Sequence, residues 1–127
     1  MMGHNSAVLI KPRKPTPAQI DYAIWIAKQH FGKRCLIHGE ACLLRSALIG
    51  SHIRPRGLES RLAANPHNII PLCVSEDQAF EKVSPGKRIR YIIERVAGLN
   101  RSDLNRLTQW IELLRSDAVA LKIAVEY

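Results

Sequence analysis

The chain has 127 residues, 46% of them hydrophobic, and a formal net charge of +8. This length and composition suit one folded domain with its own core, and no apolar run reaches the roughly 18 residues that a membrane-spanning helix needs. The excess of positive charge makes a polyanion, nucleic acid first, the expected partner, because each phosphate neutralised by Lys or Arg releases condensed counterions.

Residues 1–15 are predicted to form a flexible basic arm. This segment combines prolines with basic side chains and has no apolar pattern that could define a buried face. The remainder, residues 16–127, is predicted to form a single domain.

A helix is predicted over residues 17–30. Thr16 can cap this helix, Pro17 is tolerated at the first helical position, and Gln19 completes a capping box. Apolar residues recur along the segment at helical spacing, so one face is expected to be buried. Trp25 is predicted to belong to the core.

Residues 33–73 hold all three cysteines and three of the five histidines, and they show no sustained helical period. A short strand is predicted over residues 44–49, running on to His52, with an antiparallel partner over residues 68–72. A helix over residues 75–82 completes a β-β-α unit. The chemistry of the protein is expected to lie in this part of the chain.

Two further helices are predicted after this unit. Ser84 can cap the first, with Pro85 in its first turn and Gly98 at its end, and Ser102 begins the second. Two apolar stripes define their inner faces: Ile89, Ile92, Ile93 and Val96 on the first, and Leu104, Leu107, Ile111 and Leu114 on the second. Residues 119–125 permit either a strand or a helix.

The cysteine content bears on the compartment. Three cysteines, an odd number, do not suit a closed set of disulfides and fit a reducing environment. The first residues lack the charged and apolar blocks of a secretory signal. We therefore expect a cytoplasmic protein whose thiols are available to bind metal.

Two segments carry the most specific pattern. Residues 50–55 read Gly-Ser-His-Ile-Arg-Pro, and residues 65–75 read Asn-Pro-His-Asn-Ile-Ile-Pro-Leu-Cys-Val-Ser. A His ending one strand, an Asn in the following loop and a Cys near the start of a helix resemble the HNH, or ββα-metal, endonucleases. The resemblance covers residues 35–82 and implies an α+β fold, in which a ββα-metal core is joined by one N-terminal helix and two C-terminal helices over residues 84–127. A compact, basic, single-domain form suits a phage or mobile-element member of the family.

The resemblance assigns roles to four residues. His52 matches the general base, which takes a proton from water while a divalent cation stabilises the charge on the leaving oxygen. Asn68 is implied to brace the loop that carries this His. Asp77 takes the place of a metal ligand in one register of the last helix and Glu76 in a shorter register, and either carboxylate suits Mg²⁺ or Mn²⁺. The implied activity is metal-dependent hydrolysis of DNA.

A second group of residues has the spacing of a structural zinc site. Two residues separate Cys35 from His38, which lets both side chains reach one tetrahedral ion, and Cys73 lies a hairpin's distance away. Many HNH proteins carry such a zinc, and the resemblance puts Glu76 in the fourth ligand position. In the alternative, Cys35 and Cys73 are small buried apolar residues, which is also the expectation for Cys42.

Ser51 departs from the family pattern, because the residue before the base is typically an Asp or a His that binds the metal. A hydroxyl is a poor ligand, so the ion would depend on one carboxylate, with His67 or Glu59 as candidates for a further ligand. His67 stands in a strong turn sequence, however, and is expected to be an exposed loop residue.

Four basic residues are expected to contact DNA phosphates. Arg54 and Arg56 flank the proposed base, where their guanidinium groups could clamp a phosphate or remain solvated. Lys87 and Arg88 begin the first of the two C-terminal helices, inside the most basic part of the chain.

Two other classes of function compete with the nuclease. A degenerate HNH fold could bind nucleic acid or a host protein, as a non-enzymatic module or inhibitor, and Ser51 favours this alternative. A basic helical adaptor, in which Cys and His are only core residues, is the other.

Overall fold

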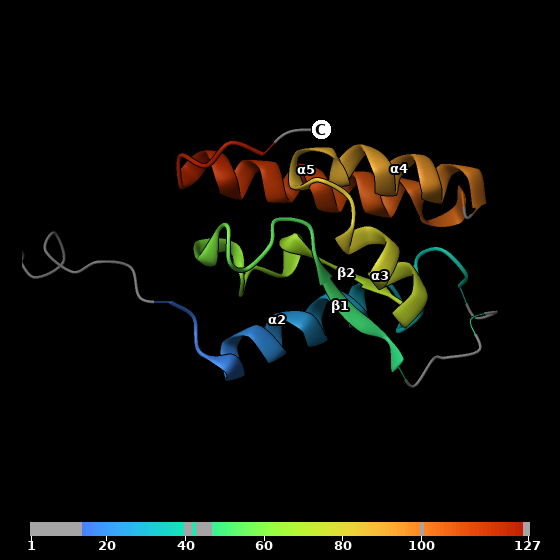
Figure 1. Cartoon of the computed structure of the whole chain (residues 1–127), viewed down its shortest axis with the longest axis horizontal. Coiled ribbons are helices and arrows are strands. Elements are labelled where there is room, and N and C mark those ends of the chain that lie inside the picture. The colour runs from blue at the N-terminus through green and yellow to red at the C-terminus, as the bar shows by residue number, and fades with distance from the viewer. Residues whose placement is uncertain (1–13, 40–41, 43–46, 100, 126–127) are drawn as a thin grey trace, which may run out of the picture.

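The computed structural model describes residues 14–39, 42, 47–99 and 101–125, so almost all of the predicted basic arm lies outside the described residues. Within them the chain forms four α-helices and one two-stranded antiparallel sheet, which confirms the expected α+β class. The elements follow in the order α2 (Pro17–His30), β1 (Ile49–His52), β2 (Ile69–Leu72), α3 (Val74–Glu81), α4 (Arg88–Leu99) and α5 (Leu104–Ala120). Figure 1 shows the strands crossing the middle of the molecule, with α2 below them and α4 and α5 above.

Helix α2 begins as its sequence predicts. The hydroxyl of Thr16 accepts a hydrogen bond from the N–H of Gln19 at 3.2 Å, and Gln19 Oε1 accepts one from the N–H of Thr16 at 2.8 Å. The buried face consists of Ala23 and Ala27. Trp25 lies two residues beyond Ala23, about 200° around the helix, and is therefore 56% exposed rather than in the core.

Strands β1 and β2 pair from Ile49 with Leu72 to His52 with Ile69. The predicted first strand began too early: β1 starts only at Ile49, because its partner strand ends at Leu72, where the chain turns into α3. Residues 44–46 of that prediction lie outside the described part. Gly50 has a packing role, since a Cβ at this position would lie 2.6 Å from Ile24 of α2. A glycine therefore allows α2 to pack closely on β1.

Helices α4 and α5 lie side by side and pack through the predicted apolar stripes. Helix α4 begins three residues later than expected and α5 two residues later, because short 3₁₀ turns, Pro85–Lys87 and Arg101–Asp103, precede them. The chain after α5 continues neither as helix nor as strand, since Lys122 takes a positive φ of 58°. The stripe residues Ile89, Ile92, Val96, Leu107, Ile111 and Leu114 are all buried, and Ile93 and Leu104 are partly so.

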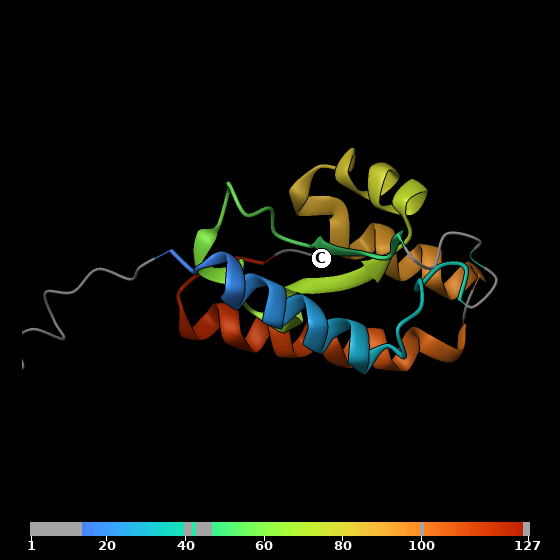
Figure 2. The same ribbon diagram turned by 90° about the horizontal axis from the view of Figure 1, so that it is seen from below.

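In the turned view of Figure 2, α2 and α5 both lie below the strands. Aromatic rings join these two helices: His30 stacks on Trp110 with centroids 4.2 Å apart, and Phe31 meets the same indole edge to face. The indole N–H also donates to the carbonyl of Ile69 in β2 at 2.9 Å. These contacts fix the sheet against the helices.

None of the described helices is long and apolar enough to cross a membrane.

Candidate functional site

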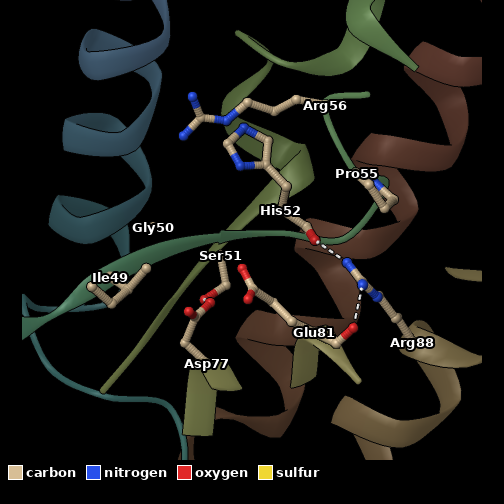
Figure 3. A pocket seen from close by; sticks show the side chains of 9 residues that line it. All are labelled: Ile49, Gly50, Ser51, His52, Pro55, Arg56, Asp77, Glu81 and Arg88. Atoms are coloured by element: carbon tan, nitrogen blue, oxygen red, sulfur yellow. Dashed lines mark hydrogen bonds between the residues drawn. The ribbon is translucent and has the colours of Figure 1, made fainter. Parts of the chain in front are cut away.

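A pocket of about 270 Å³ opens beside β1. Figure 3 shows its lining, which comes from β1, from the loop that follows it, from α3 and from the start of α4. The residues are Ile49, Gly50, Ser51, His52, Pro55, Arg56, Asp77, Glu81 and Arg88. Two residues that the sequence proposes for catalysis, His52 and Asp77, therefore share one cavity.

The imidazole of His52 is held in a defined orientation. Its Nε2 atom lies 2.8 Å from the carbonyl oxygen of Ala63. Because a carbonyl only accepts hydrogen bonds, this contact assigns the proton to Nε2 and leaves Nδ1 of the neutral ring as a proton acceptor. Burial lowers the pKa of His52, and the charge of Arg56 adds to this effect, against the Ala63 hydrogen bond and the charge of Asp77, which raise it. The ring is thus neutral at pH 7.

Asn68 ties together the loop that follows His52. Its Oδ1 atom accepts from the N–H of Arg54 at 2.8 Å, and its Nδ2 donates to the carbonyls of Arg54 and Leu62 at 3.0 and 3.1 Å. The side chain is fully buried. These are contacts of the kind that the expected bracing role requires, because they fix the backbone directly after the imidazole.

Two carboxylates enter the pocket from one face of α3. Asp77 accepts a hydrogen bond from the Ser51 hydroxyl at 2.6 Å, and Glu81 lies one helical turn further along. Sequence reasoning missed Glu81, although its spacing of four residues from Asp77 places both on one helix face. In Figure 3 the two carboxylates lie on one side of β1 and the His52 ring on the other. This follows from the alternation of Ser51 and His52 along the strand.

Glu76 does not line this pocket, unlike its neighbour Asp77. Adjacent helical residues point about 100° apart, so the Glu76 side chain is directed away from the pocket, toward His38 and Arg95. There its Oε2 atom lies 3.3 Å from His38 Nε2 and 2.8 Å from Arg95. The expectation that Glu76 holds the catalytic ion is therefore corrected, and Asp77 is left as the candidate of the two.

His67 and Glu59, the candidates for a further ligand of the catalytic ion, lie outside the pocket. His67 is half-buried rather than exposed, because Nδ1 contacts Asp117 at 2.7 Å and the ring packs edge to face on Trp110. Glu59 forms an ion pair with Arg61 at 3.0 Å. Neither His67 nor Glu59 lines the pocket.

Arg88 has a different role from the phosphate contact expected of it. The side chain is buried, and its guanidinium donates to the carbonyls of Val83, His52 and Glu81 at 3.0 to 3.1 Å. It also lies over the ring of Phe80, 5.2 Å from the centroid. Arg88 therefore links the end of β1 to the end of α3 and positions both sides of the pocket.

The other three basic residues differ in their exposure. Arg56 is exposed at the rim of the pocket, beside the His52 ring in Figure 3. Lys87 is exposed in a separate hollow on α4. Arg54 is half-buried, and its Nε atom has no hydrogen-bond partner among the described residues. Arg56 is thus the residue best placed to meet a phosphate entering the pocket.

A second cluster joins the segment before β1 to the start of α3. The ligand atoms of Cys35, His38 and Cys73 all lie within 4.8 Å of one another, so this group could hold a metal ion. A tight turn brings the first two together: Gly39, at φ 59°, donates to the Cys35 carbonyl at 2.8 Å. The N–H of Ile37 also points to Cys35 Sγ at 3.4 Å. The turn therefore brings Cys35 and His38 close together, as their two-residue separation in the sequence predicts.

The two thiols differ in acidity. Burial raises the pKa of Cys35, although backbone N–H groups of His38, Cys73 and Ile37 oppose it. Burial also acts to raise the pKa of Cys73, but the Ser75 hydroxyl, the backbone N–H of Glu76 and the side chains of Cys42 and His38 outweigh it and bring that pKa to about 6. Cys73 is therefore a thiolate at neutral pH, the form that binds metal.

No family model matches the chain, and comparisons with curated proteins and with solved structures give no match either. The resemblance to the HNH endonucleases therefore stays a hypothesis. Its support comes from the pocket and the metal-binding group described above.

Proposed function

We propose that the protein is a divalent-metal-dependent DNA endonuclease of the HNH, or ββα-metal, type. One observation carries the proposal: a neutral, oriented His52 and two carboxylates, Asp77 and Glu81, border the same pocket from opposite sides of β1. A base beside a pair of carboxylates that can bind a divalent cation suits metal-assisted hydrolysis, and the basic charge of the chain favours a phosphodiester as the substrate.

The geometry suits in-line displacement at phosphorus, in which the attacking and leaving oxygens lie on opposite sides. A phosphodiester lying across the pocket would meet His52 on one side, where Nδ1 takes the proton of the attacking water. On the other side Asp77 and Glu81 offer the oxygen ligands that Mg²⁺ and Mn²⁺ prefer, with Ser51 beside them. Such an ion supplies charge stabilisation for the leaving oxygen.

Two residues would hold the two sides of the pocket in place, and a third would contact the substrate. Asn68 fixes the loop after the base, and Arg88 fixes the base's own carbonyl to the last turn of α3. Arg56 at the rim would pair with a phosphate of the incoming strand. The net charge of +8 would add sequence-independent attraction to DNA.

The cluster of Cys35, His38 and Cys73 would hold a structural zinc ion in this proposal. Thiolate and imidazole are the ligands that zinc prefers in structural sites. The ion would tie the 35–39 turn to the start of α3, beside the two strands.

The function is tested by nicking of supercoiled plasmid with the zinc-loaded chain in Mg²⁺, in Mn²⁺ or in buffer without either ion. We expect nicked circles in either divalent ion and none without it. Folded protein that binds DNA but leaves the plasmid intact under every condition would contradict the proposal.

A non-catalytic nucleic-acid-binding module is the second candidate. One observation favours it. Ser51 stands at the position where the family pattern has a metal ligand, and its hydroxyl donates a hydrogen bond to Asp77 Oδ1 at 2.6 Å instead. Salt-dependent DNA binding without cleavage is the result that this candidate predicts.

The carboxylates should control binding of the catalytic ion. Asp77→Asn combined with Glu81→Gln is expected to weaken Mn²⁺ binding to zinc-loaded protein by at least about tenfold, because affinity follows the charge of the ligands. Electron paramagnetic resonance of free Mn²⁺ measures this directly. As a control, Glu94→Gln removes the charge of an exposed side chain on α4 and should bind Mn²⁺ like the wild type. An equal loss of Mn²⁺ affinity in both variants would argue against a site in the pocket.

The pH dependence of nicking should report the neutral form of His52. Burial lowers the pKa of His52 below its ordinary value of about 6.5. The base is active when unprotonated, so the rate is expected to rise with pH below that value and to be level at neutral pH. A pH series of single-turnover nicking in Mg²⁺ tests this, and a rate that falls with rising pH over the same range would exclude His52 as the base.

A further inference from the structure

A second cavity, the flanking cavity, opens where the segment before α2 meets the loop that follows β1. Its volume of about 380 Å³ lies in the range of sites that hold small ligands, about 300 to 1,000 Å³. It joins two segments that lie far apart in the sequence. Its walls include Lys14, Pro15, Ile20, Arg56, Leu58 and Ala63.

The flanking cavity borders the pocket that holds His52. Arg56 lines both of them. Ala63 lines the flanking cavity, and its carbonyl accepts the hydrogen bond that orients the His52 ring, at 2.8 Å. In Figure 3 the Arg56 side chain lies beside the His52 ring and away from Asp77. A strand that leaves the pocket past His52 therefore meets Arg56 and then the flanking cavity.

The loop at the rim of the flanking cavity has a defined shape and presents an apolar side chain. The N–H groups of Leu58 and Glu59 both donate to the carbonyl of Pro55, at 3.0 Å each. Leu58 on this turn stays 56% exposed. Pro15 and Ile20, which are half-buried, line the same cavity. Apolar walls of this kind are typical of sites that bind small organic groups.

The flanking cavity is also positively charged. Lys14 and Arg56 are both exposed on its walls. Glu59 is the only acidic residue among the lining residues that the structure describes, and its charge is balanced by an ion pair with Arg61 at 3.0 Å. Cations beside apolar walls match a nucleotide, which offers an anionic phosphate together with the faces of a sugar and a base.

We propose that the flanking cavity binds the nucleotide next to the scissile phosphate, on the His52 side of β1. The phosphate of this nucleotide pairs with Lys14 and Arg56, and its sugar and base lie against Leu58. The inference rests on the proposed nuclease function and names a binding site for the substrate strand beyond the pocket. Anchoring the strand there would hold the scissile phosphate in front of His52.

DNA binding without cleavage tests the two cationic contacts. Full-length, zinc-loaded protein is titrated into a fluorescein-labelled DNA duplex without Mg²⁺ or Mn²⁺, at several salt concentrations, and the anisotropy is measured. Lys14→Gln should reduce the slope of log affinity against log salt concentration by about 0.9, the contribution of one phosphate contact. Lys28→Gln removes the same charge from the last turn of α2, outside the flanking cavity, and should keep the wild-type slope. An unchanged slope in Lys14→Gln, or an equal reduction in both variants, would overturn the proposal.

A charge reversal tests the apolar wall. Leu58→Asp places a negative charge against the strand and should weaken duplex binding by about tenfold or more, because like charges repel. The matched Leu113→Asp changes a side chain that is 47% exposed on α5, outside the flanking cavity, and should bind like the wild type. Both positions are exposed, so both variants should unfold at the wild-type temperature. Equal affinities in the two variants would contradict a nucleotide site at Leu58.

These binding measurements separate the flanking cavity from the nuclease proposal, because none of them needs cleavage. A wild type that nicks plasmid, with variants that bind the duplex normally, would refute the flanking cavity alone. A wild type that binds the duplex and loses affinity as described, but never nicks, would refute the nuclease and keep the cavity as a DNA-binding site. A wild type that binds no duplex would refute both.

Discussion

Replacing His52 with Ala is expected to lower the rate of plasmid nicking by about 10²- to 10⁴-fold, which is the usual contribution of a general base. The substitution removes the imidazole, and with it the Nδ1 proton acceptor, from the lining of the pocket, while the carboxylates of Asp77 and Glu81 remain. DNA binding, measured by fluorescence anisotropy, should change little, because the imidazole is neutral and carries no charge to a phosphate.

The matched control is His30→Ala, which removes an imidazole from the end of α2, outside the pocket. It should nick at close to the wild-type rate. Because His52→Ala also loses the hydrogen bond to Ala63, circular dichroism must show that the variant is folded. Added imidazole should restore part of its rate; a variant that is folded and as fast as the wild type would remove His52 from the mechanism.

Removal of the zinc ion that we propose at Cys35, His38 and Cys73 is expected to destabilise the domain by about 4 kcal/mol or more, the range in which loss of a metal site falls. Without the ion, the turn at Cys35 and His38 keeps only separate contacts to this region, such as the hydrogen bond from the N–H of Leu36 to the carbonyl of Pro71 at 3.0 Å. For a domain of this length the thermal midpoint should fall by roughly 15 °C. Thermal unfolding before and after treatment with a zinc chelator measures the change.

Zinc, but not Mg²⁺, should restore the midpoint of the chelator-treated chain, because thiolate ligands discriminate against hard cations. Cys35→Ser should resemble the chelated wild type and respond weakly to zinc. An unchanged midpoint after chelation would show that no ion stabilises this group and that Cys35 and Cys73 are only buried core residues, as the adaptor alternative holds.

The helices could be predicted because their signals are local. Thr16 and Gln19 form the expected capping box, and the apolar stripes of α4 and α5 are buried. The placement of Trp25 could not be predicted in the same way, because apolar character alone does not show which helix face meets the sheet. The small residues Ala23 and Ala27 form that face, which lets α2 approach the sheet closely.

The candidate site was predictable in part. From the order of His52, Asn68 and Asp77 along two strands and a helix we could predict a shared site. His52 and Asp77 do line one pocket, and Asn68 braces the loop after His52. The separation of Glu76 from Asp77 depends on the rotation of α3 against β1, which no spacing in the sequence defines. Arg88 likewise looked like a surface cation, and only the fold shows the carbonyls that it binds.

The most direct test of a phosphodiester held between His52 and the two carboxylates is a crystal structure of zinc-loaded His52→Ala with a short DNA duplex and Mn²⁺. The variant prevents cleavage and leaves Asp77 and Glu81 intact. We expect an anomalous Mn²⁺ peak at these carboxylates and a backbone phosphate between the ion and position 52. Duplex bound elsewhere on the protein, with no Mn²⁺ in the pocket, would contradict the proposed nuclease site.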